Sequence, residues 1–187
     1  MEYFKEELQT IRNDNVREYT QRVLERVNDK FFHAPASSSG KYHPKYTLGD
    51  GGLYRHTRAA IKIANSLLET ATFNNFTSIQ CDYIRAALIL HDTCKSGIDW
   101  TIKHTCFEHP TLACDLIFDT FKDENNEGEQ EYQMNVTRLI ACHMGEWNTS
   151  KYSNVKLPVP ISDDEIFVHL CDYLASRKFI EINFEEN

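Results

Sequence analysis

The chain has 187 residues, 41% of them hydrophobic and 26% charged, which is enough for one domain with a sizeable core. Its formal net charge of -8 argues against binding of long duplex nucleic acid through a basic surface. Its apolar runs are far shorter than the roughly 18 residues needed to span a membrane, and the charged start "MEYFKEELQT" lacks the apolar core of a signal peptide. We therefore expect a cytoplasmic protein that does not contact a membrane.

The cysteine pattern agrees with a reducing compartment. Six cysteines occur without C-x-x-C spacing, and most of them lie in segments with a helical pattern. We interpret them as reduced thiols, with a disulfide framework as the alternative because their number is even. They are Cys81, Cys94, Cys106, Cys114, Cys142 and Cys171.

Apolar residues recur every three to four positions along most of the chain, which predicts an all-α bundle of about six to eight helices. A first helix is predicted over residues 2–30 and is followed by a Pro-, Ser- and Gly-rich loop over 31–51, whose length is typical of functional loops. Residues 93–108 and 148–162 are further loops, and the end "KFIEINF" fits an edge strand or a docking tail. The other helices are predicted from Gly52, from Thr77 to His91, from Pro110, over 131–145, and from an N-cap at Ser162 to Lys178.

Metal-type ligands lie on or beside the apolar faces of these helices. His91 follows Leu88 by three residues and Asp172 follows Val168 by four, and such spacings share a helix face. Buried carboxylates need a partner, and a matching set of inward Lys or Arg is missing, so a divalent metal would supply the charge. Any one histidine could instead be an ordinary core or surface residue. Six side chains are candidate ligands: His56, His91, Asp92, His109, His143 and Asp172.

The order His56, His91-Asp92, Asp172 resembles the H…HD…D signature of the HD-domain phosphohydrolase superfamily, an all-α bundle. The segments "GGLYRHT", "LILHDTCKSG", "EHPTLA", "IACHMG" and "CDYLASRK" resemble in particular the HD domain of YhaM-type 3′-5′ exoribonucleases and their phage and bacterial relatives. The resemblance implies a single HD domain over 1–187, with an N-terminal helix over 1–30 and an HD core over 31–180. It also implies that the protein is located in the cytoplasm of a bacterium, or of an infected host cell if the gene is phage-encoded.

The same resemblance implies one metal held by His56, His91, Asp92 and Asp172. His109 and His143 match the extra histidines of members with two metals, in which the Asp of the HD pair bridges. Two departures stand out: Cys142 replaces a common histidine, although Cys can itself bind soft metals, and "HDTCK" has Cys94 in place of a helix-ending Gly. We expect two divalent transition-metal ions (Mn, Fe, Ni or Zn), with one ion as the alternative.

The predicted activity is metal-dependent hydrolysis of a phosphate ester or phosphodiester, because water bound to such metals is a nucleophile at neutral pH. Asp92 would hold that water. Lys95 would reach a phosphate oxygen as a point charge, and Arg177 would stand at the edge of the site. Their alternative interpretations are a solvated loop lysine and a helix C-terminal cation.

The substrate is predicted to be a small nucleotide or a short oligonucleotide. In "KYHPKY", Lys41 and Tyr42 belong to a run of rings and cations that can stack on a base and steady a phosphate. Trp100 and Trp147 could add a base platform; an ordinary polar loop and tryptophans packed under the chain are the alternatives. The YhaM-type enzymes carry an additional OB domain for which this chain has no room, which favours a small substrate.

Three other functions stay open. The first is a 3′-5′ exonuclease that acts on single-stranded nucleic acid with the HD core alone. The second is a non-catalytic module that senses a metal or ligand, against which the complete ligand set and Lys95 argue. The third is an oxygenase with two irons. The sequence does not indicate the oligomeric state.

Overall fold

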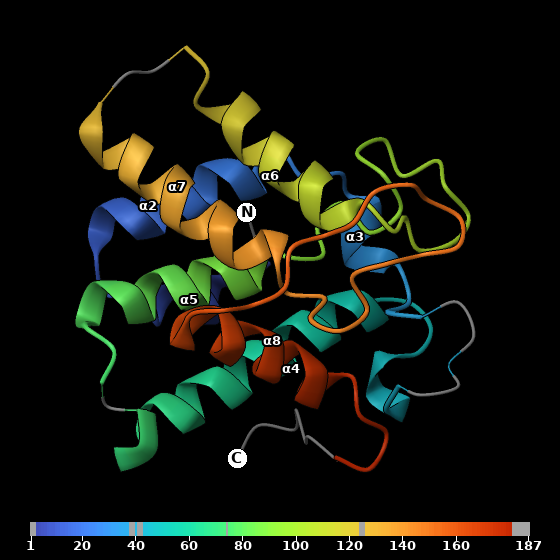
Figure 1. Ribbon diagram of the computed structural model, residues 1–187, viewed down its shortest axis with the longest axis horizontal. Helices are drawn as coiled ribbons and strands as arrows, with labels where there is room; N and C mark the ends of the chain where they lie inside the picture. The colour runs from blue at the N-terminus through green and yellow to red at the C-terminus, as the bar shows by residue number, and fades with distance from the viewer. Residues whose placement is uncertain (1–2, 38–39, 41–42, 74, 124–125, 181–187) are drawn as a thin grey trace.

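The computed structural model describes residues 3–37, 40, 43–73, 75–123 and 126–180. These residues form eight α-helices and two short 3-10 helices, with no β-strand among them (Figure 1). The predicted all-α bundle is therefore confirmed. In chain order the elements are α1 (Lys5–Gln9), α2 (Asp14–Leu24), α3 (Lys30–His33), η1 (Lys45–Thr47), α4 (Gly52–Leu68), η2 (Ala71–Phe73), α5 (Ser78–Leu90), α6 (His109–Thr120), α7 (Glu127–Ala141) and α8 (Asp163–Ala175).

The single helix predicted over residues 2–30 is wrong, because the chain turns between α1 and α2. The buried carboxylate of Asp82 in α5 accepts hydrogen bonds from the backbone N–H groups of Arg12 (3.0 Å) and Asn13 (2.9 Å) in this turn. Asp82 is also paired with Arg85 at 3.1 Å. A side chain 70 residues away thus satisfies amides that a continuous helix would have bonded internally.

Other boundaries shift by a turn or less. Helix α3 lies at the start of the predicted loop, α7 begins at Glu127 before the predicted start, and α8 ends at Ala175 before Lys178. The predicted capping box of Ser162 and Glu165 is present at the start of α8. Residues 178–180 form no strand, and the rest of the predicted strand or tail lies outside the described residues.

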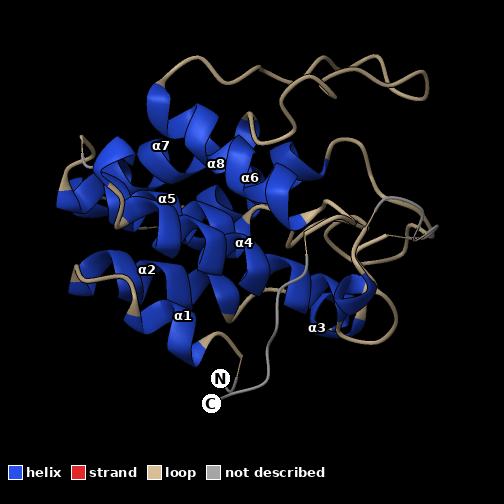
Figure 2. Ribbon diagram, turned by 90° about the horizontal axis from the view of Figure 1, so that it is seen from below, coloured by secondary structure: helices blue, strands red, loops and turns tan. Residues whose placement is uncertain are grey.

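Three helices form the centre of the molecule. Helix α4 packs against α8 and α5, and α5 also contacts α7 and α8. Every residue of α5 from Asp82 to Leu90 is buried. Because α5 is buried on all sides, the residues that follow its last turn, His91 and Asp92, also lie in the interior. Figure 2 shows the long loops gathered at one side of this bundle.

None of the helices in the described ranges combines the length and the apolar character that crossing a bilayer requires.

Candidate metal centre

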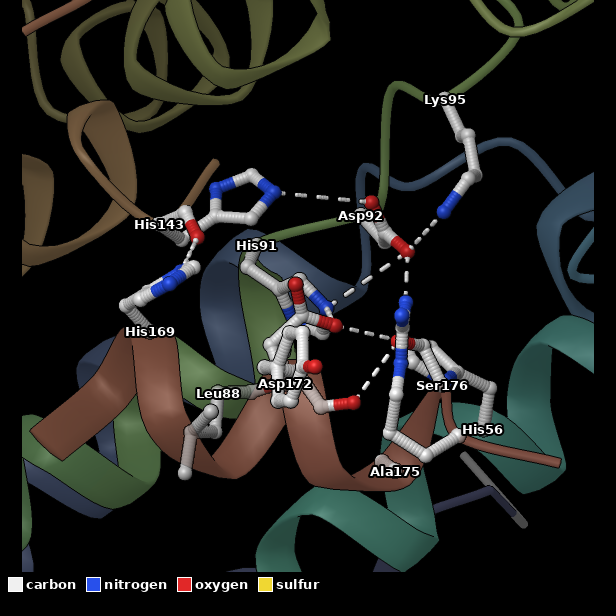
Figure 3. A network of polar contacts seen from close by, with 12 residues as sticks. His56, Leu88, His91, Asp92, Lys95, His143, His169, Asp172, Ala175 and Ser176 are labelled. Carbon is white, nitrogen blue, oxygen red and sulfur yellow. Dashed lines mark hydrogen bonds and ion pairs between the residues drawn. The ribbon is translucent and has the colours of Figure 1, made fainter. Parts of the chain in front are cut away.

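The six predicted ligands meet at the centre of the bundle, although they come from five different helices or helix ends. Figure 3 shows His56, His91, Asp92, His143 and Asp172 at this centre. The four histidines and Asp92 are at most 1% exposed. The side chain of Asp172 is 19% exposed, so the centre has an opening on the α8 side. Their ligand atoms lie within 4.8 Å of one another in three overlapping trios: His56–His91–Asp92, His91–His143–Asp172 and Asp92–His109–His143.

Three of the histidines are held in one tautomer. In each ring Nδ1 faces the backbone carbonyl of the residue three positions earlier, and a carbonyl can only accept a hydrogen bond, so Nδ1 carries the proton. Nε2 of the neutral ring then presents a lone pair, which is the form that binds a metal. The contacts are His91 to Leu88 (2.8 Å), His109 to Cys106 (2.7 Å) and His143 to Ile140 (2.7 Å).

The ends of two helices explain this arrangement. The last carbonyls of an α-helix lack intrahelical partners. His91 follows the last residue of α5, and His143 stands two residues after the end of α7. Each ring folds back onto a carbonyl of the final turn, so the helix end fixes the orientation of the ligand.

The Nε2 atoms of these three rings lie toward a shared centre, where the carboxylates of Asp92 and Asp172 outweigh burial and raise the pKa of His91. Nε2 of His109 lies 3.2 Å from Nε2 of His143. Burial, together with the neighbouring His91 and His109, lowers the pKa of His143 to about 3. Nε2 of His91 and Oδ1 of Asp92 are buried and have no hydrogen-bond partner in the described part of the chain. Buried ligand atoms without a hydrogen-bond partner are suited to bind a divalent cation, and imidazole together with carboxylate suits transition metals.

Asp92 stands between two groups of ligands. Its Oδ1 is 3.0 Å from Nε2 of His109, and its Oδ2 is 3.5 Å from Nε2 of His91 and 3.7 Å from Nε2 of His56. One oxygen therefore faces the His109–His143 side and the other faces the His56–His91 side. A carboxylate placed in this way can serve two ions.

Both carboxyl groups at the centre are ionised. Burial alone would raise the pKa of Asp92, but the nearby Lys95 and His91 outweigh it and hold that pKa well below its ordinary value. Asp172 behaves in the same way: burial acts to raise its pKa, but the hydrogen bond with His56 and the nearby His91 outweigh burial and hold that pKa well below its ordinary value. Nε2 of His56 is 2.8 Å from Oδ1 of Asp172.

The predicted substrate-binding residues divide into three cases. Lys95 lies at the centre, with its Nζ 2.5 Å from Oδ2 of Asp92 (Figure 3). Arg177 follows α8 and donates from Nε and Nη2 to the Ser176 hydroxyl, while its guanidinium lies over the ring of Tyr173 at 4.2 Å. Lys41 and Tyr42 lie outside the described residues.

His43 was not among the predicted site residues, but it borders the centre. Its ring centroid is 6.0 Å from that of His56, and its buried Nδ1 has no hydrogen-bond partner among the residues described. Burial, then the charges of His56 and Lys95, lower its pKa to about 4. The sequence indicated a loop of aromatic and cationic residues here, but hydrophobic periodicity does not predict the path that a loop takes.

His169 is a second residue that the sequence analysis missed. Its Nδ1 donates to the backbone carbonyl of His143 at 2.7 Å and so supports that ligand. Gly145 has a φ of 57°, and a Cβ at this position would lie 2.2 Å from a carbon of the His169 ring. The signal was present, because His169 precedes Asp172 by three residues and therefore shares its helix face.

The two sequence departures have ordinary structural roles. Sγ of Cys142 donates to the carbonyls of Arg138 (3.3 Å) and Leu139 (3.5 Å), and burial raises its pKa to about 12. The thiol therefore faces its own helix and is not one of the clustered ligands. Cys94 is a buried thiol whose pKa burial likewise raises to about 12.

The two loop tryptophans differ. Trp100 is buried and donates from Nε1 to the carbonyl of Thr93 at 3.0 Å, so its predicted part in a base platform is wrong. It packs under the loop that contains it. Trp147 is 45% exposed and stacks on Tyr173, with ring centroids 5.7 Å apart.

The fold and the buried cluster define an all-α protein with a histidine–carboxylate site that can hold divalent metal. Residues 53–177 match the family model of the HD domain, and the chain belongs to this family. The family lies in the metal-dependent phosphohydrolase superfamily and its members are generally hydrolases. Searches of curated proteins and of solved structures returned no match. The predicted closeness to YhaM-type exoribonucleases is not confirmed by the family match.

Proposed function

We propose that the protein is a metal-dependent hydrolase that cleaves a phosphate ester or phosphodiester of a nucleotide or short oligonucleotide. The observation that carries this proposal is the convergence of three imidazole rings of fixed orientation and two ionised carboxylates in the buried centre. A structural histidine cluster would have no need for the unpaired Nε2 of His91, because burying a polar atom without a partner costs free energy.

The ligand set suits two ions. His56, His91, Asp92 and Asp172 would hold one, and Asp92, His109 and His143 would hold the second, with manganese, iron, nickel and zinc all compatible with these donors. When bound, such ions supply Lewis acidity toward a phosphoryl oxygen and lower the pKa of water.

The residues of the chain have separate tasks in this proposal. Asp92 orients the attacking water, and its ionised state suits it to accept a hydrogen bond. Lys95 acts as a point charge for a phosphate oxygen, since its ammonium already lies at the edge of the centre. Lys41, Tyr42 and Arg177 are proposed to bind the substrate outside the centre. The buried surroundings strengthen each of these electrostatic contacts relative to water.

We also propose that residues 31–180 form the HD core of a single domain and that the protein works in the cytoplasm. All six cysteines are free thiols, which agrees with a reducing compartment.

Turnover assays test the activity. The purified protein with manganese is assayed against a panel of nucleotides and against a labelled single-stranded oligonucleotide, beside the folded variants His91→Ala and Asp92→Ala. Phosphate release that both substitutions abolish supports the proposal. Shortening of the oligonucleotide from its 3′ end would instead identify an exonuclease. Unchanged turnover in either variant, or metal binding without any turnover, would contradict the assignment.

A further inference from the structure

A small cavity lies beside the proposed catalytic centre. It has a volume of about 80 Å³ and lies between residues 34–36 with Leu53 on one side and the loop 95–105 on the other. Lys95 lines this cavity, and the same side chain pairs with Asp92. A single residue therefore connects the cavity to the metal ligands.

Among the residues that the structure describes, the only charged ones that line the cavity are two lysines, Lys95 and Lys103. The other polar residues of the lining are His104, Ser96 and Thr105, and none of these lining residues is acidic. This is unusual in a chain with a net charge of -8. Within the described part of the chain, Lys103 makes no ion pair and is exposed, so its charge is available to a ligand.

The loop that presents these groups has a fixed shape. The backbone N–H of Cys106 donates to the carbonyl of Lys95 at 2.7 Å, and that of Ile102 donates to the carbonyl of Ser96 at 3.2 Å. Trp100, with a φ of 54°, is buried under the loop. Because the frame is already hydrogen-bonded, the backbone positions that carry Lys95 and Lys103 are set before a ligand binds.

The size of the cavity limits its occupant. Pockets for whole organic ligands usually exceed roughly 300 Å³. A cavity of about 80 Å³ has room for a phosphate-sized anion but not for a nucleoside. Ammonium groups and hydroxyls are suitable donors to phosphate oxygens.

We propose that this cavity binds a second, non-reacting phosphate group of the substrate, which makes the substrate a nucleotide with more than one phosphate. This substrate class rests on the proposed hydrolase function. Lys95 then contacts both the reacting phosphate and its neighbour, and Lys103 contacts the neighbour only.

Titration with inorganic phosphate tests the anion site without any turnover. Isothermal titration calorimetry compares the full-length protein with Lys103→Ala and with Lys156→Ala, which removes the same charge from another exposed position. We expect Lys103→Ala to weaken one phosphate-binding event by roughly three- to tenfold, and Lys156→Ala to stay close to wild type. Equal phosphate binding by all three proteins would overturn the proposed anion site. Phosphate binding at the metal centre alone would give this result.

Steady-state kinetics then test the substrate class. Lys103→Ala should raise the KM of a nucleoside diphosphate several-fold more than the KM of the corresponding monophosphate. Equal changes in both KM values would overturn the assignment of the substrate. If the wild-type protein hydrolyses no phosphate compound, the hydrolase function fails, while the calorimetric result still decides on the anion site.

Discussion

Nε2 of His109 lies 3.2 Å from Nε2 of His143, although each ring already uses its Nδ1–H on a backbone carbonyl. Two lone pairs at this distance repel each other unless a cation lies near both. Burial lowers the pKa of His143 to about 3, so this ring does not itself take up a proton at neutral pH. The relationship therefore points to a divalent metal, with the ionised Asp92 next to it.

Removal of metal is expected to destabilise the fold. A ligand that binds only the folded state stabilises it by about 2.7 kcal/mol at a hundred times its Kd. For a domain of this size that corresponds to roughly 5–10 °C in Tm. Thermal unfolding followed by circular dichroism, with chelator and after addition of manganese, checks this. An identical Tm with and without metal would contradict a structural link between the cluster and an ion.

Lys95→Met should lower kcat by about a hundredfold, a loss typical of removing one electrostatic group that stabilises a transition state. Methionine keeps the length of the side chain but not the charge beside Asp92. Metal content should be retained, because Lys95 is not a ligand. Lys122→Met is the control, since this exposed lysine pairs with Asp119. Full activity of Lys95→Met would show that the ammonium does not act on the substrate.

Gly145→Ala should disturb the support of His143. A Cβ would meet the ring of His169 at 2.2 Å, and a φ of 57° is strained for alanine. Gly49→Ala is the matched control, because Gly49 has a φ of 69° and nothing within 4 Å of the added carbon. We expect about 1–2 kcal/mol for the control from strain alone. For Gly145→Ala we expect about 1–3 kcal/mol more from the clash.

Urea unfolding measures the two free energies, and metal content reports on His143. A displaced His169 gives up its hydrogen bond to the His143 carbonyl, so the metal content of Gly145→Ala should also fall. Equal destabilisation of Gly145→Ala and Gly49→Ala would show that the contact with His169 is unimportant.

Stability should depend on pH through Asp164 at the start of α8. Burial alone would raise the pKa of Asp164, but hydrogen bonds from Arg138 (2.6 Å) and Ser162 (2.5 Å) outweigh it and lower that pKa. The unfolded chain then binds more protons than the folded chain just below the ordinary Asp pKa, so stability falls as the pH falls through this window.

Asp164→Asn should lower the free energy of unfolding at pH 7 by about 1.5–3 kcal/mol, as for other hydrogen bonds to charged groups. The difference from wild type should shrink as the pH drops below about 4, because the unfolded chain takes up a proton there that folded Asp164 binds only at lower pH. Asp163→Asn, at the exposed neighbouring position, should cost at most about 1 kcal/mol. Chemical unfolding at several pH values checks this, and a difference that stays constant down to pH 2 would disprove the role of the ionised carboxylate.

The sequence predicted the fold class and the central cluster for identifiable physical reasons. Helical periodicity marked the inward faces, and His91, Asp92 and Asp172 lie where those faces meet. It did not predict the break between α1 and α2, because this turn depends on Asp82, which is remote in sequence. His43 and the cavity beside Lys103 depend on loop paths, and loops carry no periodic signal.

Metal analysis of the purified protein tests the central claim most directly. After loading with manganese and removal of excess ions, elemental analysis should find two ions per chain in the wild type and one in His109→Ala. The exposed His33, which lies near Asp29 and Asp50, provides the control His33→Ala, and this variant should keep both ions. A wild-type protein that retains no stoichiometric metal, or a His109→Ala variant with unchanged occupancy, would contradict the metal centre described above.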